Sequence, residues 1–91
     1  MILKNAIELL EEHQIKIYPN PANDEIVISN PKEIELTEAY IYNMGGSLIK
    51  TINLNNMGKE KLIDISDLVG SAFIILIKGE NVRVTRQLFK E

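Results

Sequence analysis

Few side chains in this sequence are of the kinds that carry out chemistry. It has one histidine, His13, and no cysteine, which excludes disulfides, thiol catalysis and cysteine-bound zinc. A catalytic triad or a metal site would need further residues of suitable types near His13, and the sequence indicates none. Glu8 and Glu12 lie four residues apart on one face of a predicted helix, where like charges repel mildly and are usually solvated. The sequence therefore predicts a protein that is not an enzyme and that uses no cofactor and no metal.

Two segments are candidates for binding a small ligand. The turn over residues 20–24 carries oxygen-bearing side chains of the kind that bind calcium. Tyr40 and Tyr42 stand two apart in a predicted strand, so both rings lie on its outer face if Ile41 points inward. Such a pair forms either a ligand patch or a support for cross-strand neighbours. A small carbohydrate- or calcium-binding module is therefore one alternative for the function.

The composition argues against two other kinds of partner. The 91 residues carry a formal net charge of −3, so the chain builds no basic field for nucleic acid or for an anionic membrane surface. The longest apolar run, residues 72–77, has the length of a strand and not of a membrane helix. The N-terminus has glutamates where a secretory signal peptide would be apolar. If the chain stands alone, it is expected in the cytoplasm.

The chain divides into a helical segment, residues 1–14, and a β-rich domain, residues 15–91. Asn5 followed by Glu8 indicates a capping box at the start of the helix. Its apolar stripe at helical spacing consists of Ile2, Leu3, Ala6, Ile7 and Leu10. So short a helix is marginal alone in water, so the stripe is expected to dock. It either packs on its own domain, belongs to a larger parent protein, or forms an interface with a partner.

The second segment alternates with a period of two and is divided by turns. Seven strands are expected, at residues 15–18, 25–29, 34–43, 47–53, 61–65, 72–78 and 82–89. A phase slip near Thr37 and Glu38 predicts either a bulge or a break into two short strands. Gly45-Gly46 predicts a two-residue hairpin turn. The apolar strand at 72–78 is expected to be central. This spacing predicts an all-β fold, an immunoglobulin-like antiparallel sandwich with a short N-terminal helix.

Four motifs in order resemble a known family. Residues 18–24 (YPNPAND) are similar to the YPNPA-x-D opening of the type A C-terminal sorting domain carried by cargo of the type IX secretion system, the outer-membrane export route of Bacteroidetes. Residues 41–48 (IYNMGGSL) resemble its hairpin, and residues 65–68 (ISDL) with the following strand resemble its S-x-L element. Residues 84–90 (VTRQLFK) resemble its last strand. The resemblance covers residues 15–91.

Three positions depart from the family pattern. Ser47 stands where an arginine or lysine is usual, and Gln87 replaces a frequent lysine. Ser71 stands at a glycine position directly after Gly70, which predicts that this turn is shifted by one residue.

The resemblance implies a folded export signal that is not an enzyme. It implies recognition by the translocation machinery, cleavage ahead of the domain by a surface sortase, and a secreted or cell-surface location as part of a larger cargo protein. By position it implies recognition at Pro19, Asn20, Pro21, Gly46 and Lys90. The last strand is expected at a sheet edge, with free backbone groups that a partner strand could pair with.

A further alternative is a structural one. The domain would then self-associate or bind other proteins, through an edge strand or through the helix residues Ile2, Leu3, Ile7 and Leu10. A homo-oligomer is the expected form in that case.

Overall fold

The computed structural model describes residues 14–91 and contains seven β-strands. They are β1 Lys16–Tyr18, β2 Glu25–Ser29, β3 Leu36–Asn43, β4 Leu48–Asn53, β5 Glu60–Asp64, β6 Ala72–Gly79 and β7 Arg83–Phe89. All seven predicted strands are confirmed, each within two residues of its expected limits. The predicted N-terminal helix falls on residues 1–13, which lie outside the described part of the chain, and on Gln14, which is not helical.

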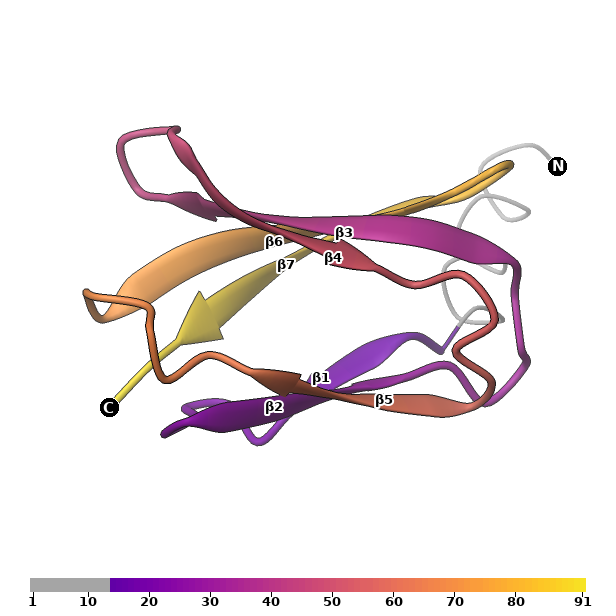
Figure 1. Ribbon diagram of the computed structural model, residues 1–91, viewed down its shortest axis with the longest axis horizontal. Coiled ribbons are helices and arrows are strands. Elements are labelled where there is room, and N and C mark those ends of the chain that lie inside the picture. Colours follow the sequence, from indigo (N-terminus) through magenta and orange to yellow (C-terminus); the bar gives the residue numbers. More distant parts are fainter. Residues whose placement is uncertain (1–13) are drawn as a thin grey trace, which may run out of the picture.

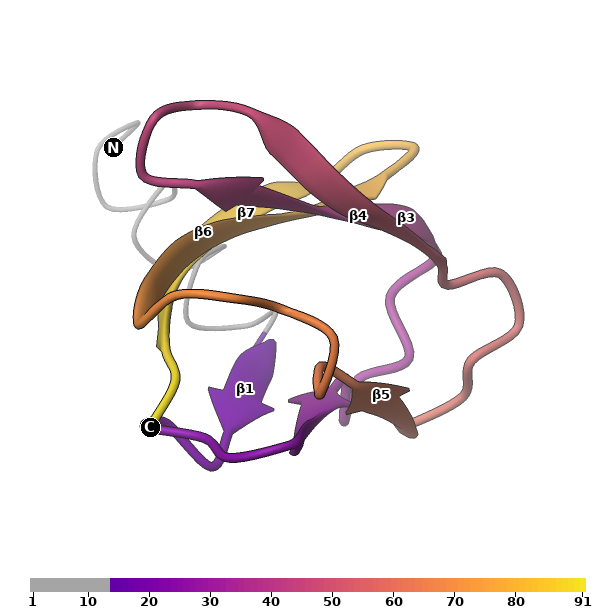
Figure 2. The same ribbon diagram turned by 60° about the vertical axis from the view of Figure 1, so that its left-hand side comes forward.

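The strands form two antiparallel sheets that lie one above the other (Figures 1 and 2). One sheet has the order β1-β2-β5 and the other the order β4-β3-β6-β7. The apolar strand β6 lies between β3 and β7, so its predicted central place is confirmed. Short connections join neighbouring antiparallel strands as hairpins, and the other connections cross between the two sheets. Within residues 14–91 there is no helix with the length and apolar character that crossing a membrane requires.

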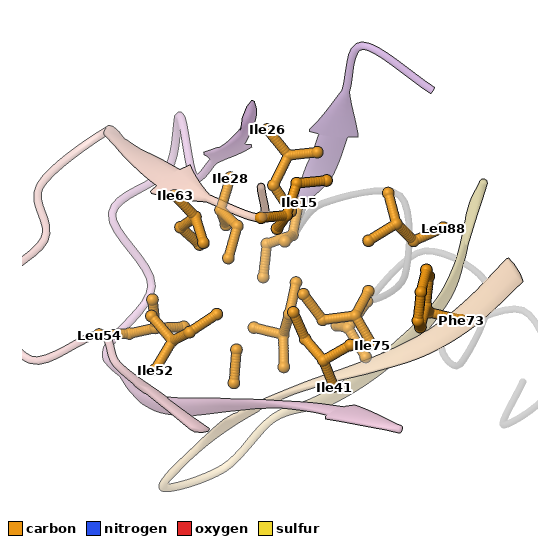
Figure 3. Packing of buried hydrophobic residues seen from close by; sticks show 14 of the residues in the cluster. Ile15, Ile26, Ile28, Ile41, Ile52, Leu54, Ile63, Phe73, Ile75 and Leu88 are labelled. Carbon is orange, nitrogen blue, oxygen red and sulfur yellow. The ribbon is translucent and has the colours of Figure 1, made fainter. Parts of the chain in front are cut away.

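Isoleucines make up half of the buried apolar residues between the sheets, and most of them alternate along the strands. Ile26 and Ile28 of β2 point toward Ile41 of β3 and Ile75 of β6, and all four are fully buried (Figure 3). Burying each such side chain contributes roughly 1.5–3 kcal/mol. Because Ile41 points inward, its neighbours on β3 face outward, as the sequence predicts.

The hairpin between β3 and β4 has a three-residue loop, so the prediction of a two-residue turn is wrong. The amide of Asn43 donates to the carbonyl of Ser47, which leaves residues 44–46 in the loop. Gly46 has φ of 89°, whereas Gly45 has no positive φ. A turn followed by one left-handed glycine is the usual geometry of a three-residue hairpin loop. Two adjacent glycines are compatible with a two-residue loop and with a three-residue loop. The pairing register of β3 and β4 corresponds to the three-residue loop.

Of the two alternatives near Thr37 and Glu38, the structure shows the bulge, within one continuous strand. The pairing of β3 with β6 shifts between Leu36 and Glu38, so the alternation of inward and outward residues changes phase there. Gly79 of β6 lies opposite Leu36 at this point. The backbone carbonyl of Glu35, directly before β3, approaches Gly79 so closely here that a Cβ on Gly79 would overlap it.

Candidate recognition site at the C-terminal end of the sandwich

Four segments gather at the end of the sandwich where the chain terminates, on the left in Figure 1. They are residues 19–24 between β1 and β2, 44–47 between β3 and β4, 65–71 between β5 and β6, and 90–91 after β7. We call this the C-terminal end of the sandwich. The four motifs of the sequence, which are spread along the chain, all contribute residues to it.

The side chain of Asn20 ties the first segment to the last strand. Its Nδ2 donates a hydrogen bond to the carbonyl of Gln87 at 2.8 Å, and its Oδ1 accepts one from the amide of Phe89 at 2.9 Å. An amide side chain thus makes the two bonds that a neighbouring strand would make. The flanking Pro19 and Pro21 both follow cis peptide bonds, and both are exposed.

The backbone of Ala22 continues this pairing. Its amide donates to the carbonyl of Phe89 at 2.7 Å, and its carbonyl accepts from the amide of Glu91 at 2.8 Å. The strand β7 is an edge strand of its sheet, as predicted. The sequence predicts free backbone groups on this edge. That prediction is wrong for residues 87–91, because Asn20 and Ala22 form hydrogen bonds with the backbone groups there. This protection is of the kind that keeps edge strands from pairing with other chains.

Lys90 holds the third segment in place. Its amide donates to the carbonyl of Ser71 at 2.9 Å, and its Nζ donates to the carbonyls of Leu68 at 2.5 Å and Ser66 at 3.4 Å. The Leu68 amide donates a hydrogen bond to the Ile65 carbonyl, which closes a turn at this point. Lys90 therefore serves as a cap for the carbonyl groups of this turn.

Acidic side chains fix the same turn from its other side. Asp64 Oδ1 accepts from the amide of Ser66 at 2.8 Å. Asp67 forms an ion pair with Lys50 of β4 at 3.1 Å. The hydrogen bonds from Ser66 lower the pKa of Asp64 below its ordinary 3.8, and the positive charges of Lys50 and Lys90 act in the same direction. The ionised form of Asp64 is thus the form that the folded turn favours.

We expect the stability of the domain to depend on pH through Asp64. Because its pKa is lower in the folded state, its contribution is present above about pH 4 and is lost as the pH falls through the folded-state value. Asp64→Asn keeps the side-chain oxygen and removes the charge. Urea unfolding measured from pH 6 downward should show a shallower loss of stability for the variant than for the parent. Two parallel curves would contradict this assignment.

Two exposed apolar side chains lie at the same end, one in the β3–β4 loop and one at the start of β4. Met44 is 63% exposed and Leu48 is 51% exposed. A Cβ built on Gly46 would meet no atom within 4 Å, so this position faces open space. Ser47, which replaces the usual basic residue, is exposed, so the departure leaves the packing unchanged.

The turn before β6 takes its positive φ at a glycine. Gly70, and not Ser71, takes the positive φ, at 128°. Only glycine adopts this conformation readily. Val69, directly before it, is 93% exposed.

The structure brings Pro19, Asn20 and Pro21 together with Lys90, through the pairing with β7. Gly46 lies in a separate loop at the same end (Figure 1). Sequence reasoning missed the exposed apolar residues Met44, Leu48 and Val69. Their signal was present, because each is a large apolar residue within or beside a glycine-containing turn.

Residues of both ligand candidates make hydrogen bonds within the domain. Tyr40 donates a hydrogen bond to Glu38 Oε1 at 2.6 Å, next to it on the same face of β3. The carbonyl of Asp24 accepts from the amide of Ile65 and so joins two turns. Among residues 14–91, no three His, Cys, Asp or Glu side chains come together in the way a metal ion needs.

Fold and site together define a small β-sandwich whose distinctive residues meet at one end. The family described as the secretion system C-terminal sorting domain matches residues 16–91. The chain therefore belongs to this family, the C-terminal sorting domains of type IX secretion, which is a family of sorting signals and not of enzymes. No curated protein and no solved structure matches the chain.

Proposed function

We propose that this domain directs a larger cargo protein through the type IX secretion system to the outside of the cell, where it becomes attached to the surface. The family membership over residues 16–91 is the observation that carries the proposal. The machinery would contact the C-terminal end of the sandwich, at Pro19, Asn20, Pro21, Gly46 and Lys90. The grouping of the family motifs at this end supports that location.

The hydrogen bonds of Lys90 and Glu91 support a signal that the secretion machinery recognises only when the domain is folded. The amides of Lys90 and Glu91 and the Lys90 Nζ bond two loop segments, residues 19–24 and 65–71, that are far apart in the sequence. An unfolded or truncated chain cannot assemble this surface. A sortase that cleaves ahead of residue 15 would leave the whole sandwich intact. The immunoglobulin-like character of the sandwich is part of the proposal, and the arrangement β1-β2-β5 over β4-β3-β6-β7 supports it.

An export assay tests the proposed function. Residues 1–91, and separately residues 15–91, are fused behind a signal peptide and a fluorescent reporter. The fusions are expressed in a bacterium with an intact type IX system and in a strain that lacks it. We expect the reporter at the surface only in the intact strain, with either fusion. Retention in the periplasm of both strains, with the domain shown to be folded, would contradict the export role.

Self-association is a second candidate, which the edge strand β4 favours. Ile49 is 40% exposed there, and the one charged residue of the strand, Lys50, is already paired with Asp67. No other strand of residues 14–91 pairs with the free side of β4, and an unpaired edge can pair with the strand of another molecule. Concentration-dependent oligomers that disappear in Ile49→Lys, together with no export, would favour this second function.

A further inference from the structure

Large apolar side chains are exposed mainly at one end of the sandwich. Those exposed within residues 14–91 are Tyr18, Met44, Leu48, Ile49, Leu62, Val69 and Phe89. All except Ile49 and Leu62 lie in, or directly beside, the segments of the C-terminal end. The connections at the opposite end, residues 30–35, 54–59 and 80–82, contain none of these exposed residues (Figure 1). Single exposed apolar residues are common on soluble proteins, whereas their concentration at one end is typical of a binding surface.

The fold does not account for the apolar residues in the loops of this end. Val69 is 93% exposed, so it gains almost nothing from burial within the domain. Turn positions of this kind usually carry polar residues or glycine. The positive φ angles of the two turns belong to Gly46 and Gly70, so the backbone geometry does not require an apolar residue at Met44 or Val69.

The β3–β4 hairpin and the loop before β6 adjoin one another. Lys50 follows Leu48 by two residues on β4, and Asp67 precedes Val69 by two residues in the loop. The side chains of Lys50 and Asp67 form an ion pair at 3.1 Å. The apolar residues of the hairpin and of the loop therefore belong to two segments that one ion pair holds together.

The charge around these residues is mainly negative. The exposed acidic residues in or directly beside the segments of this end include Asp24, Glu25, Asp64 and Glu91. The ammonium groups of Lys50 and Lys90 already bond Asp67 and loop carbonyls. A surface that inserts apolar residues into anionic lipid carries basic side chains around them. The charge here is complementary instead to a protein whose apolar groove has basic side chains at its rim.

We infer that Met44, Leu48 and Val69 make the apolar contact with the secretion machinery, in an apolar groove that basic side chains surround. This contact is part of the proposed export function and rests on it. A few residues usually contribute most of the free energy of a protein interface. Because the three side chains are exposed, their replacement should impair export without unfolding the domain.

Serine substitutions test this contact in the export assay, with residues 1–91 behind the signal peptide and the fluorescent reporter. Met44→Ser and Val69→Ser should each lower surface display, and together they should lower it about tenfold. Leu62→Ser is the matched control. Leu62 is 61% exposed, close to the 63% of Met44, but lies within β5 on the outer face of the three-stranded sheet. Its display should equal that of the parent, and thermal unfolding of the purified domains should show that every variant is folded.

The outcomes separate this contact from the export function itself. Parent-level display of the double variant, or an equal loss in Leu62→Ser, would overturn the inference and leave the export function standing. Retention of the folded parent fusion in the periplasm would overturn both. Vesicles of anionic phospholipid test the membrane as the partner: the purified domain is expected to stay in solution. Sedimentation with the vesicles that Val69→Ser abolishes would overturn the assignment to a protein groove.

Discussion

Gly79→Ala is expected to destabilise the domain by about 3 kcal/mol or more. A Cβ at this position would lie against the backbone carbonyl of Glu35 and only 2.8 Å from Cγ1 of Val82. The backbone obstacle cannot rotate away as a flexible side chain could, so β3 and β6 would have to separate at the bulge. With about 4–8 °C for each kcal/mol in a domain of this size, the melting temperature should fall by about 12 °C or more. Thermal unfolding followed by circular dichroism measures this shift.

Gly45→Ala is the matched control. Gly45 has no positive φ, and the nearest atom to a Cβ there is Asn43 Oδ1 at 3.4 Å, an ordinary contact. Its melting temperature should stay close to that of the parent. Similar melting temperatures for Gly79→Ala and the parent would show that the close approach at the bulge does not constrain the fold.

Asn30→Ala is expected to cost about 2–4 kcal/mol, because it leaves two backbone groups without their bonds. Asn30 is only 1% exposed. Its Nδ2 donates to the Ile34 carbonyl at 2.8 Å, and its Oδ1 accepts from the Ile34 amide at 3.1 Å. These bonds hold the connection between β2 and β3, which crosses from one sheet to the other. Urea unfolding should show a lower midpoint.

Asn55→Ala serves as the control for this change. Asn55 is an exposed loop residue at the same end of the sandwich, so truncation there should change stability by less than about 0.5 kcal/mol. An equal loss in the two variants would mean that the buried amide of Asn30 has no special role.

The strands could be predicted because local rules determine them. Alternation of apolar residues sets which side of each strand is buried, and prolines and glycines mark the turns. The run of apolar residues at 72–77 indicates burial on both sides, and β6 is indeed central. The slip of phase near Thr37 was visible in the sequence for the same reason, because a bulge changes the parity of the residues after it.

The remaining features depend on which segments meet in space. Asn20 is an ordinary turn residue in the sequence, and only the fold places its amide on the edge of β7. Gly79 reads as a turn glycine, and its close approach to Glu35 follows from the register at the bulge. Asn30 before a proline also indicates a turn, without showing that the turn is buried. Such contacts between distant segments have no local signature.

One pair of substitutions tests most directly whether the C-terminal end of the sandwich is the recognised surface. Gly46 and Gly58 are both exposed, have φ of 89° and 75°, and have open space where a Cβ would lie. Gly46 belongs to the β3–β4 hairpin at the C-terminal end, whereas Gly58 belongs to the β4–β5 connection at the opposite end (Figure 1). Gly46→Glu and Gly58→Glu should therefore cost a similar 1–2 kcal/mol, about the cost of a left-handed residue.

The measurement is the fraction of fluorescent reporter that reaches the cell surface through the type IX system with each variant, once both are shown to be folded. The account predicts that Gly46→Glu lowers surface display strongly and that Gly58→Glu leaves it close to the parent level. Equal display of the two variants, or a loss confined to Gly58→Glu, would contradict it.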